Sequence, residues 1–483
     1  MHKALDVRGT TAVQRAPVVD NLSTSNVEFP RKNGATGPAV VAPAEGGESG
    51  YVWPLGVSAV ATDQFRFDVG TPGDHAAIQQ LLSSVFHGPS RDDFAAALED
   101  PFYEPNDRII VRRGARVLGH VQLAQRVVRY GDRELPTSVW YRLAVLPEYR
   151  GRGFGARLVE KAEAAMRADG SVLGLLTTRI PHYFRKFGWA ACIRHSHAQV
   201  GARDVLAQLS ARGLPIAASD DDLNIRPWRH VELPSLVRLY DAATARAFGP
   251  CRRTEAYWRW LVGRQPTEGL LVALAGPHRH GFDMHDDAIV GYALVRDDRV
   301  LEIVAAPNRS GVRERLLARA CGEAIERDHH VVQVNLPPDD ELWSVVEAAG
   351  GTAHRSEAYQ GEVTMAKLLD PAAFLRDLLP DLQRRAAATS LRRPIELSFL
   401  VGESSLRLTV GPRSAKLVQA GPGRTRIRMS DADFTRLLLG HLDLEQATAE
   451  GRIGFTQRQG VQIAAALFPR RPLWRPPLDD LLV

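Results

Sequence analysis

The residues best suited to chemistry lie in one turn in the first half of the chain, where arginines and glycines are interleaved. An apolar run from Leu143 to Leu146 ends at Pro147, which predicts a strand that stops there. The turn that follows contains Arg150, Gly151, Arg152, Gly153 and Gly155. Glycines let the main chain approach an anion closely, and the unpaired N–H groups at the start of a helix favour negative charge. We therefore expect a turn that cradles a diphosphate.

A helix is expected directly after this turn. Apolar residues follow at helical spacing, namely Ala156, Leu158, Val159, Ala162 and Met166. A Walker loop would need Lys and then Ser or Thr after the last glycine, and a dinucleotide-binding fingerprint would need glycine at position 150. A plain surface turn rich in Gly and Arg is the other alternative, but the preceding strand and the following helix favour the phosphate cradle.

The composition is that of a globular protein with several domains. The chain has 483 residues, more than one hydrophobic core usually serves, and 45% of them are hydrophobic. The net charge is +5, with basic and acidic residues interspersed, so no nucleic-acid-binding surface is expected. Cys192, Cys251 and Cys321 lie far apart and lack metal-ligand spacing, which predicts a reducing compartment and no metal. No apolar run is long enough to cross a bilayer, so we expect a cytoplasmic protein without membrane insertion.

The first two of four expected segments lead up to and include the turn. Residues 1–62 are rich in small and polar residues without a sustained period, which predicts a disordered tail. Residues 63–205 show a strand, two helical stretches, three strands and the motif helix, then a strand, a short helix and a closing strand near residues 190–200. This segment is the expected catalytic domain.

The other two segments follow it. Residues 222–366 repeat much of the same order, but the corresponding turn at residues 306–315 holds a single glycine, so we expect the same fold without the phosphate cradle. Residues 370–483 differ, with a helical stretch, four alternating strands and a helix that Ser430 and Asp433 would cap.

The pattern Arg150-x-x-Gly153-x-Gly155, in its strand-turn-helix context, resembles the signature of the GNAT acetyltransferases, the Gcn5-related superfamily. The third folded segment resembles a sterol carrier protein type domain, with Leu-Leu-x-Gly at residues 437–440 and Gly-x-Ile at residues 451–453. An active GNAT domain, a degenerate one and this tail resemble, in that order, the Eis-type (enhanced intracellular survival) acetyltransferases.

The resemblance implies an α/β (α+β) fold: two tandem GNAT domains, each a mixed central sheet flanked by helices, and a sterol-carrier-like α+β domain. It also implies an N-acetyltransferase that uses acetyl-CoA as co-substrate, needs no metal, accepts aminoglycosides, polyamines or lysine side chains, and assembles as a hexamer. The residues that it assigns to coenzyme A are Val145, Leu146, Arg150, Gly151, Arg152, Gly153, Phe154, Gly155 and Ala156.

The chemistry of acetyl transfer adds three requirements. A main-chain N–H of the strand before the cradle, that of Val145 or Leu146, is expected to bind the thioester carbonyl. The departing thiolate needs a proton donor, which family members supply with a Tyr four residues before a Gly-aromatic pair; here Phe184 holds that position and Tyr183 is next to it. An amine with a pKa near 10.4 needs a base, and the resemblance implies the C-terminal carboxylate, here that of Val483.

Two further groups of residues have alternative interpretations. The acidic run Asp92, Asp93, Glu99, Asp100, Glu104 and Asp107 could attract a cationic amine or form a solvated helix face. His278, His280 and His285 are expected in a surface loop. For the whole chain, the alternatives to an acetyltransferase are a carrier of lipid or another apolar ligand and a sensor of acetyl-CoA with little catalysis.

Overall fold

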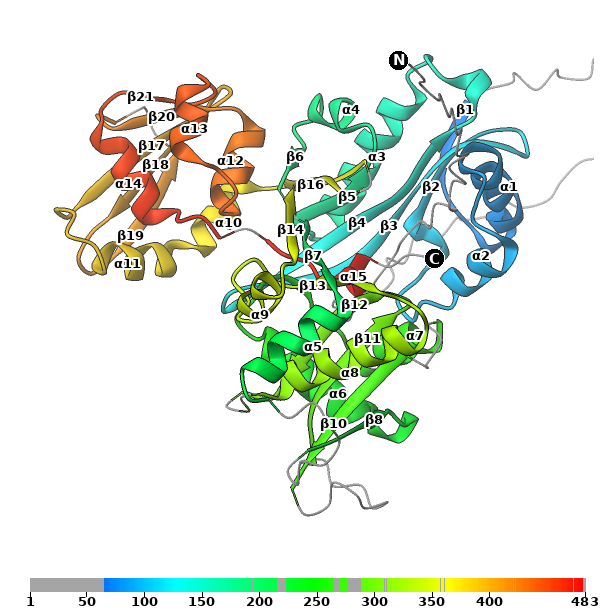
Figure 1. Ribbon diagram of the computed structural model, residues 1–483. Coiled ribbons are helices and arrows are strands. Elements are labelled where there is room, and N and C mark those ends of the chain that lie inside the picture. The colour runs from blue at the N-terminus through cyan, green and yellow to red at the C-terminus, as the bar shows by residue number, and fades with distance from the viewer. Residues whose placement is uncertain are drawn as a thin grey trace, which may run out of the picture.

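A computed structural model describes residues 65–192, 195–214, 223–264, 269–276, 288–307, 309, 311–356, 358–359, 361–419, 421, 423–471 and 473–480. The predicted tail at residues 1–62, the three histidines at 278, 280 and 285, and Val483 lie outside these residues. The described strands form three separate sheets (Figure 1). The α/β fold class is therefore confirmed.

The first sheet contains the turn identified from the sequence. Its main path is β1-β2-β3-β4-β5-β16-β15, with β6 beside β16 and β9 beside β3. These strands are β1 (Phe65–Val69), β2 (Arg108–Arg113), β3 (Arg116–Tyr130), β4 (Arg133–Val145), β5 (Leu173–Thr178), β6 (Ala190–Ala191), β9 (Phe248–Cys251), β15 (Ala358–Tyr359) and β16 (Glu362–Leu368). β2, β3 and β4 are antiparallel, and β4 pairs with β5 in parallel.

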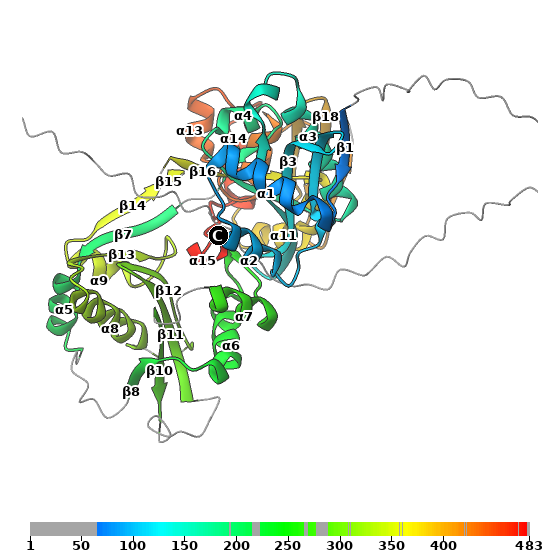
Figure 2. The same cartoon turned by 90° about the vertical axis from the view of Figure 1, so that its right-hand side faces the viewer.

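Helices cover both faces of this sheet (Figure 2). They are α1 (His75–Phe86), α2 (Arg91–Leu98), α3 (Phe154–Ala168) and α4 (Pro181–Arg185), with short 3-10 turns η1 (Pro72–Asp74), η2 (Pro105–Asp107) and η3 (Pro147–Tyr149). α3 connects the parallel strands β4 and β5, and its apolar residues Leu158, Val159, Ala162 and Met166 are fully buried, as their helical spacing predicts. Ser90 caps α2 by accepting a hydrogen bond from the Asp93 N–H at 3.0 Å.

The second sheet has the order β14-β7-β13-β12-β11-β10-β8. Its strands are β7 (His195–Gly201), β8 (Leu223–Pro227), β10 (Leu270–Ala275), β11 (Ile289–Arg296), β12 (Arg299–Ala305), β13 (Val331–Asn335) and β14 (Thr352–Ser356). Its helical elements are α5 (Ala202–Ala211), η4 (His230–Glu232), α6 (Leu233–Thr244), α7 (Glu255–Arg264), α8 (Val312–Glu326) and α9 (Trp343–Ala348).

The first and second sheets exchange strands. The strand expected to close the first sheet, β7, pairs with β13 and β14 of the second sheet instead. In return β16, at the end of the second segment, pairs with β5 and β6 of the first sheet. The first sheet therefore contains residues from two sequence segments. The strand β16, which completes its edge, follows the strands of the second sheet along the chain.

The first and second sheets share the same connection from a strand to the helix that follows it. In the first sheet the Leu146 N–H donates to Leu118 O at 2.9 Å, and in the second the Ala306 N–H donates to Val290 O at 2.8 Å. A helix of 15 residues follows in each, beginning after a glycine of positive φ, Gly153 (81°) or Gly311 (79°). Both sheets thus carry the same local architecture.

The third sheet has the order β19-β18-β17-β20-β21, with β17 and β20 parallel. Its strands are β17 (Ile395–Val401), β18 (Ser404–Val410), β19 (Ala415–Gln419), β20 (Arg426–Met429) and β21 (Gly454–Phe455). The helices of this part are α10 (Pro371–Asp377), α11 (Leu379–Ala387), α12 (Asp431–Leu438), α13 (Leu444–Ala449) and α14 (Gln459–Leu467). The predicted cap of α12 is confirmed, since Ser430 Oγ accepts from the Asp433 N–H at 3.1 Å.

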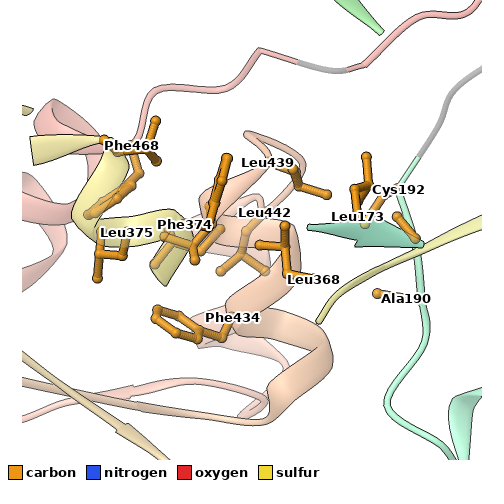
Figure 3. Close-up of a cluster of buried hydrophobic side chains, with 14 of the residues drawn as sticks. Leu173, Ala190, Cys192, Leu368, Phe374, Leu375, Phe434, Leu439, Leu442 and Phe468 are labelled. Carbon is orange, nitrogen blue, oxygen red and sulfur yellow. The ribbon is translucent and has the colours of Figure 1, made fainter. Parts of the chain in front are cut away.

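The third sheet's helices pack on the edge of the first sheet through one apolar cluster (Figure 3). Phe374, Phe434 and Leu442 meet Leu368 of β16 and Leu173 of β5 in this cluster. Because these side chains are almost completely removed from water, the contact behaves as part of the core.

The last described helix is α15 (Pro477–Asp480), which both views show between the first two sheets (Figures 1 and 2). Asp479 is fully buried, and its carboxylate accepts from Arg253 Nε and from the Cys251 N–H, both at 2.7 Å. Arg253 also donates to both carboxylate oxygens of Glu302 on β12, at 3.0 and 2.8 Å. Asp479 therefore links α15 to the first sheet through Cys251 of β9 and, through Arg253, to Glu302 of the second sheet.

Candidate active site

The motif turn lies where β4 and β5 separate. The two strands pair from Thr137 to Trp140 on the β4 side, and their ladder ends there although β4 continues to Val145. The last part of β4 therefore has one edge that no strand covers, and this edge leads directly into η3 and α3.

The main chain of β4 is arranged so that one of the two predicted donors faces this open edge. The Leu146 N–H donates to Leu118 O on β3 and is therefore already used within the sheet. Hydrogen-bonding groups along a strand alternate between its edges, so Val145 presents its N–H to the open side. Its carbonyl accepts a hydrogen bond from Arg150 Nε at 3.1 Å. Of the two donors predicted from the sequence, only Val145 therefore has its N–H on the open side of β4.

The glycines of the turn have the conformations that a cradle needs. Gly151 and Gly153 have φ of 76° and 81°, in the region that favours glycine, and a Cβ on either would meet nothing within 4 Å. The first intrahelical bond of α3 runs from the Arg157 N–H to Gly153 O, so the N–H groups of the first turn, including Ala156, have no acceptor within the helix. A diphosphate fits this exposed, positively polarised turn.

The side chains of the motif line the turn without closing it. Arg150 and Arg152 are exposed, and the Arg152 guanidinium lies 5.2 Å from the centre of the Tyr149 ring. Phe154 is buried beneath the turn and packs against Phe65 with ring centres 4.9 Å apart. The arginines therefore remain available to an anion, while Phe154 anchors the helix to β1 rather than contacting solvent.

The helix α4 directs Tyr183, not Phe184, toward the cradle. Phe184 is 5% exposed and packs against Trp140 and Trp189 in the core. The Tyr183 hydroxyl lies at the start of α3, 2.7 Å from the point that a Cβ on Gly155 would occupy. Burial raises the pKa of Tyr183, so the phenol keeps its proton and can donate it.

A chain of polar side chains lies beneath α1 and α2, on the opposite face of the sheet. His120 Nδ1 donates to Arg142 O at 3.1 Å, and Arg108 Nη1 donates to His120 Nε2 at 3.1 Å. Arg108 Nε donates to the Tyr103 hydroxyl at 2.9 Å, which in turn lies 2.7 Å from His75 Nε2. The sequence alone does not indicate this chain, because its members come from separate elements and meet only through tertiary packing.

The acidic run on the acceptor side is largely occupied by structural contacts. Asp93 caps α2, and Asp100 forms a 3.0 Å ion pair with the buried Arg126. Asp107 accepts from the Glu104 N–H at 2.9 Å in the turn before β2. Asp92, Glu99 and Glu104 are exposed. Three of the six carboxylates thus remain free to act on a distant cation, which is fewer than the sequence suggests.

Asp107 has an unusual carboxyl group. Burial, together with the neighbouring charges of Asp100 and Glu104, raises its pKa to about 7, although Arg126 opposes the shift. It precedes Arg108, which pairs with Gln122 of β3, and Gln122 pairs with Tyr141 of β4. Asp107 thus precedes β2, which is separated from β4 by one strand of the sheet.

Comparison with known proteins agrees with this geometry. Residues 67–192 match the family model described as an acetyltransferase (GNAT) domain. Over 134 residues the chain is 28% identical to the uncharacterized N-acetyltransferase YjhQ of Escherichia coli (strain K12), covering 26% of this chain and 71% of that protein. Residues 67–192 thus form a GNAT acetyltransferase domain, which supports an acetyltransferase enzyme; GNAT domains use acetyl-CoA as co-substrate.

Solved structures share the fold over most of the chain. A GCN5-related N-acetyltransferase from Kribbella flavida matches with a TM-score of 0.65 and 17% identity, over 86% of this chain and 99% of that one. A GCN5-related N-acetyltransferase from Anabaena variabilis gives 0.64 and 16%, over 85% and 99%. Eis1 from Mycobacterium abscessus gives 0.58 and 16%, over 85% and 98%. At these identities the likeness concerns the fold. Every described helix is too short or too polar to cross a membrane.

Proposed function

We propose that the chain transfers acetyl from acetyl-CoA to a primary amine of a cationic acceptor by direct attack within a ternary complex. The observation that carries the proposal is the meeting, at the start of α3, of the open glycine turn, the uncovered edge of β4 and the Tyr183 hydroxyl. In this proposal the main chain of residues 150–156 holds the diphosphate, Val145 faces the thioester and Tyr183 donates a proton to the departing thiolate.

The base is proposed to be the C-terminal carboxylate of Val483. Asp479 is fixed four residues earlier, so the carboxylate can lie no more than about 14 Å from it. Asp107, with its raised pKa, is the alternative base.

Thiol release from acetyl-CoA with spermidine, kanamycin and a lysine peptide tests the function. Wild type should turn over at least one acceptor, and Tyr183→Phe should lower kcat about 10- to 100-fold. Deletion of residues 481–483 and Asp107→Asn separate the two bases, since the change that removes the base should have the larger effect on kcat/KM. Gly153→Glu should abolish CoA binding by calorimetry, and unchanged affinity would reject the cradle.

We also infer that residues 222–366 form a degenerate GNAT domain. The matching main-chain bond before α8 and the positive φ of Gly311 support this inference, as does the parallel pairing of β12 with β13. The turn lacks the arginine and glycine pattern, so acetyl-CoA should bind one site per chain. Calorimetric titration with CoA measures that stoichiometry, and two sites of similar affinity would contradict it.

A carrier function is a second candidate because a cavity of about 500 Å³ lies away from the cradle, between the end of α3 and the third sheet. Its apolar lining includes Leu369, Leu406, Leu417 and Phe434, and Arg167 and Arg376 also line it. Asp370 and Asp431 line it as well, so the cavity suits an apolar ligand with a polar group. The sterol carrier type of residues 370–483 remains a proposal on the same basis. Native mass spectrometry distinguishes the candidates, because a retained lipid favours carriage and retained CoA favours transfer.

A further inference from the structure

We propose that His120 is a positioning residue for acetyl transfer. Through Arg142 O it holds the peptide between Arg142 and Leu143 so that the Leu143 N–H faces the thioester and donates to its carbonyl oxygen. The inference rests on the proposed function: Val145 stays on the same open edge of β4, but the hydrogen bond to the thioester carbonyl is assigned to the Leu143 N–H and not to that of Val145.

The geometry of the peptide carries the first step. Arg142 has φ of 54°, a conformation rarely adopted by a non-glycine residue, and its carbonyl accepts from His120 Nδ1 at 3.1 Å. The C=O and N–H of a trans peptide point in opposite directions. Because the carbonyl is turned toward His120, beneath α1 and α2, the Leu143 N–H is turned toward the face on which α3 begins.

The strand register shows a β-bulge at this peptide. β3 pairs His120 with Ala144 and Gln122 with Tyr141, so the register shifts over Arg142 and Leu143. The β4–β5 ladder already ended at Trp140. At this shift the Arg142 carbonyl accepts from the His120 side chain of the neighbouring strand, so His120 helps to set the orientation of the bulged peptide.

Arg108 determines which ring nitrogen of His120 carries the proton. A guanidinium only donates, so the contact from Arg108 Nη1 makes His120 Nε2 an acceptor and leaves the proton on Nδ1. Burial, and then the Arg108 charge, hold the pKa of His120 well below its ordinary value. The neutral ring therefore presents its single N–H to Arg142 O at all pH values near neutrality.

The burial of Arg108 argues that this arrangement has a purpose beyond stability. Arg108 is 0% exposed, and its guanidinium lies 4.8 Å from the centre of the Phe94 ring and 5.2 Å from that of Tyr103. In the described part of the chain the Arg108 side chain hydrogen-bonds to Tyr103 and His120, neither of which is a carboxylate. An unpaired buried cation is costly for folding, which is expected where function requires it.

The second sheet provides an internal comparison. Gly291 corresponds to Gly119, because a Cβ on either would meet the following strand and a leucine of the following helix, Leu316 or Leu158. Tyr292 then takes the place of His120, and the register is regular from the pair Tyr292 with Val304 to the pair Leu294 with Glu302, after which it shifts between Leu294 and Val295. The sheet that lacks the Arg-x-x-Gly-x-Gly cradle also lacks the histidine, and its bulge lies at a different position.

Three substitutions test the role of His120. In His120→Asn the amide nitrogen can occupy the place of Nδ1 and still donate to Arg142 O. In His120→Gln the amide reaches the place of Nε2 and contacts Arg108 but not Arg142 O, and His120→Leu removes both contacts. The readouts are kcat for acetyl transfer, CoA affinity by calorimetry, and the carbonyl ¹³C resonance of bound [1-¹³C]acetyl-CoA, which moves downfield when the oxygen accepts a hydrogen bond.

We expect His120→Gln and His120→Leu to lower kcat about 100-fold and His120→Asn to retain most of it, because loss of one such donor has that effect. The bound carbonyl resonance should be downfield in wild type and His120→Asn and should approach the free value in the other two, with CoA affinity unchanged throughout. Equal loss in the Asn and Gln variants, or one resonance position in all four proteins, would overturn the inference alone. Failure of wild type to bind acetyl-CoA would overturn the proposed function with it. If His120→Leu does not fold, the Asn and Gln pair decides.

Discussion

Tyr183 and Gly155 are in direct contact across the start of α3, with the phenol oxygen 2.7 Å from the position of a Cβ at residue 155. Real Cβ atoms do not approach an oxygen so closely, so the absence of a side chain at Gly155 is what admits the hydroxyl. The last glycine of the motif therefore serves the proton donor, whereas Gly151 and Gly153 serve the backbone conformation of the turn.

Gly155→Ala is expected to displace the Tyr183 hydroxyl and to lower kcat as Tyr183→Phe does, about 10-fold or more. Because both changes remove the same group from the same place, the double variant should show no further loss. Steady-state kinetics of the two single variants and the double variant make this test. Multiplying losses would mean that Gly155 and Tyr183 act independently.

Gly153→Ala should affect cofactor binding rather than the chemical step. A Cβ there meets nothing within 4 Å, but φ of 81° strains any other residue by about 1 kcal/mol, so the turn should relax away from its cradle conformation. We expect weaker CoA binding by calorimetry and nearly normal kcat at saturating acetyl-CoA. Gly151→Ala is the matched variant, since its surroundings are equally open and its φ is 76°. Unchanged affinity in both would contradict the role assigned to the turn.

A fragment of residues 63–205 should not form a stable monomer. It lacks β16, which pairs with β5 over six residue positions, and with it the buried Met365 and Leu368. It also retains β7, whose partners β13 and β14 are missing. Unpaired strand edges promote association, so the fragment should aggregate in size-exclusion chromatography. A version ending at residue 192 with residues 361–369 joined by a linker should remain soluble, and a monomeric, folded 63–205 fragment would reject this reasoning.

The strand exchange explains how far the sequence could predict this fold. The helix after the motif turn and the cap at Ser430 occur where the sequence predicts them, because periodicity and capping are local properties. An alternating pattern shows that β7 is a strand but not which sheet it joins, since that depends on partners more than 100 residues away. The site divides in the same way: the glycine turn is contiguous in sequence, whereas the contacts of Arg108 with His120 and of Tyr183 with Gly155 arise only from tertiary packing.

Asp479→Ala should destabilise the protein strongly. The substitution leaves Arg253, which is 1% exposed, without one of its two carboxylates and leaves the buried Cys251 N–H without an acceptor. Breaking a buried ion pair from one side typically costs about 3–5 kcal/mol. Asp241→Ala is the control, because its pair with Arg129 is partly exposed and should contribute less than about 1 kcal/mol. Urea denaturation measures the free energy of unfolding of both variants. Similar losses in the two would show that the contacts of Asp479 in α15 add little to stability.

Asp107 should make folding stability depend on pH in the opposite sense to an ordinary paired carboxylate. Its pKa in the folded protein is about 7, because of burial, and an unfolded aspartate has a pKa of about 3.9. Between these values the folded state binds more protons than the unfolded state, so the contribution of Asp107 to stability is largest at low pH and declines as pH rises through this window.

Asp107→Asn keeps an oxygen that can accept from the Glu104 N–H and removes the charge. The variant should therefore gain stability over wild type at pH 8 and lose that advantage near pH 4. Denaturation at several pH values compares it with Asp92→Asn, which removes an exposed charge from α2. If all three proteins have the same slope of stability against pH, the carboxyl of Asp107 ionises as freely in the folded protein as it does in water.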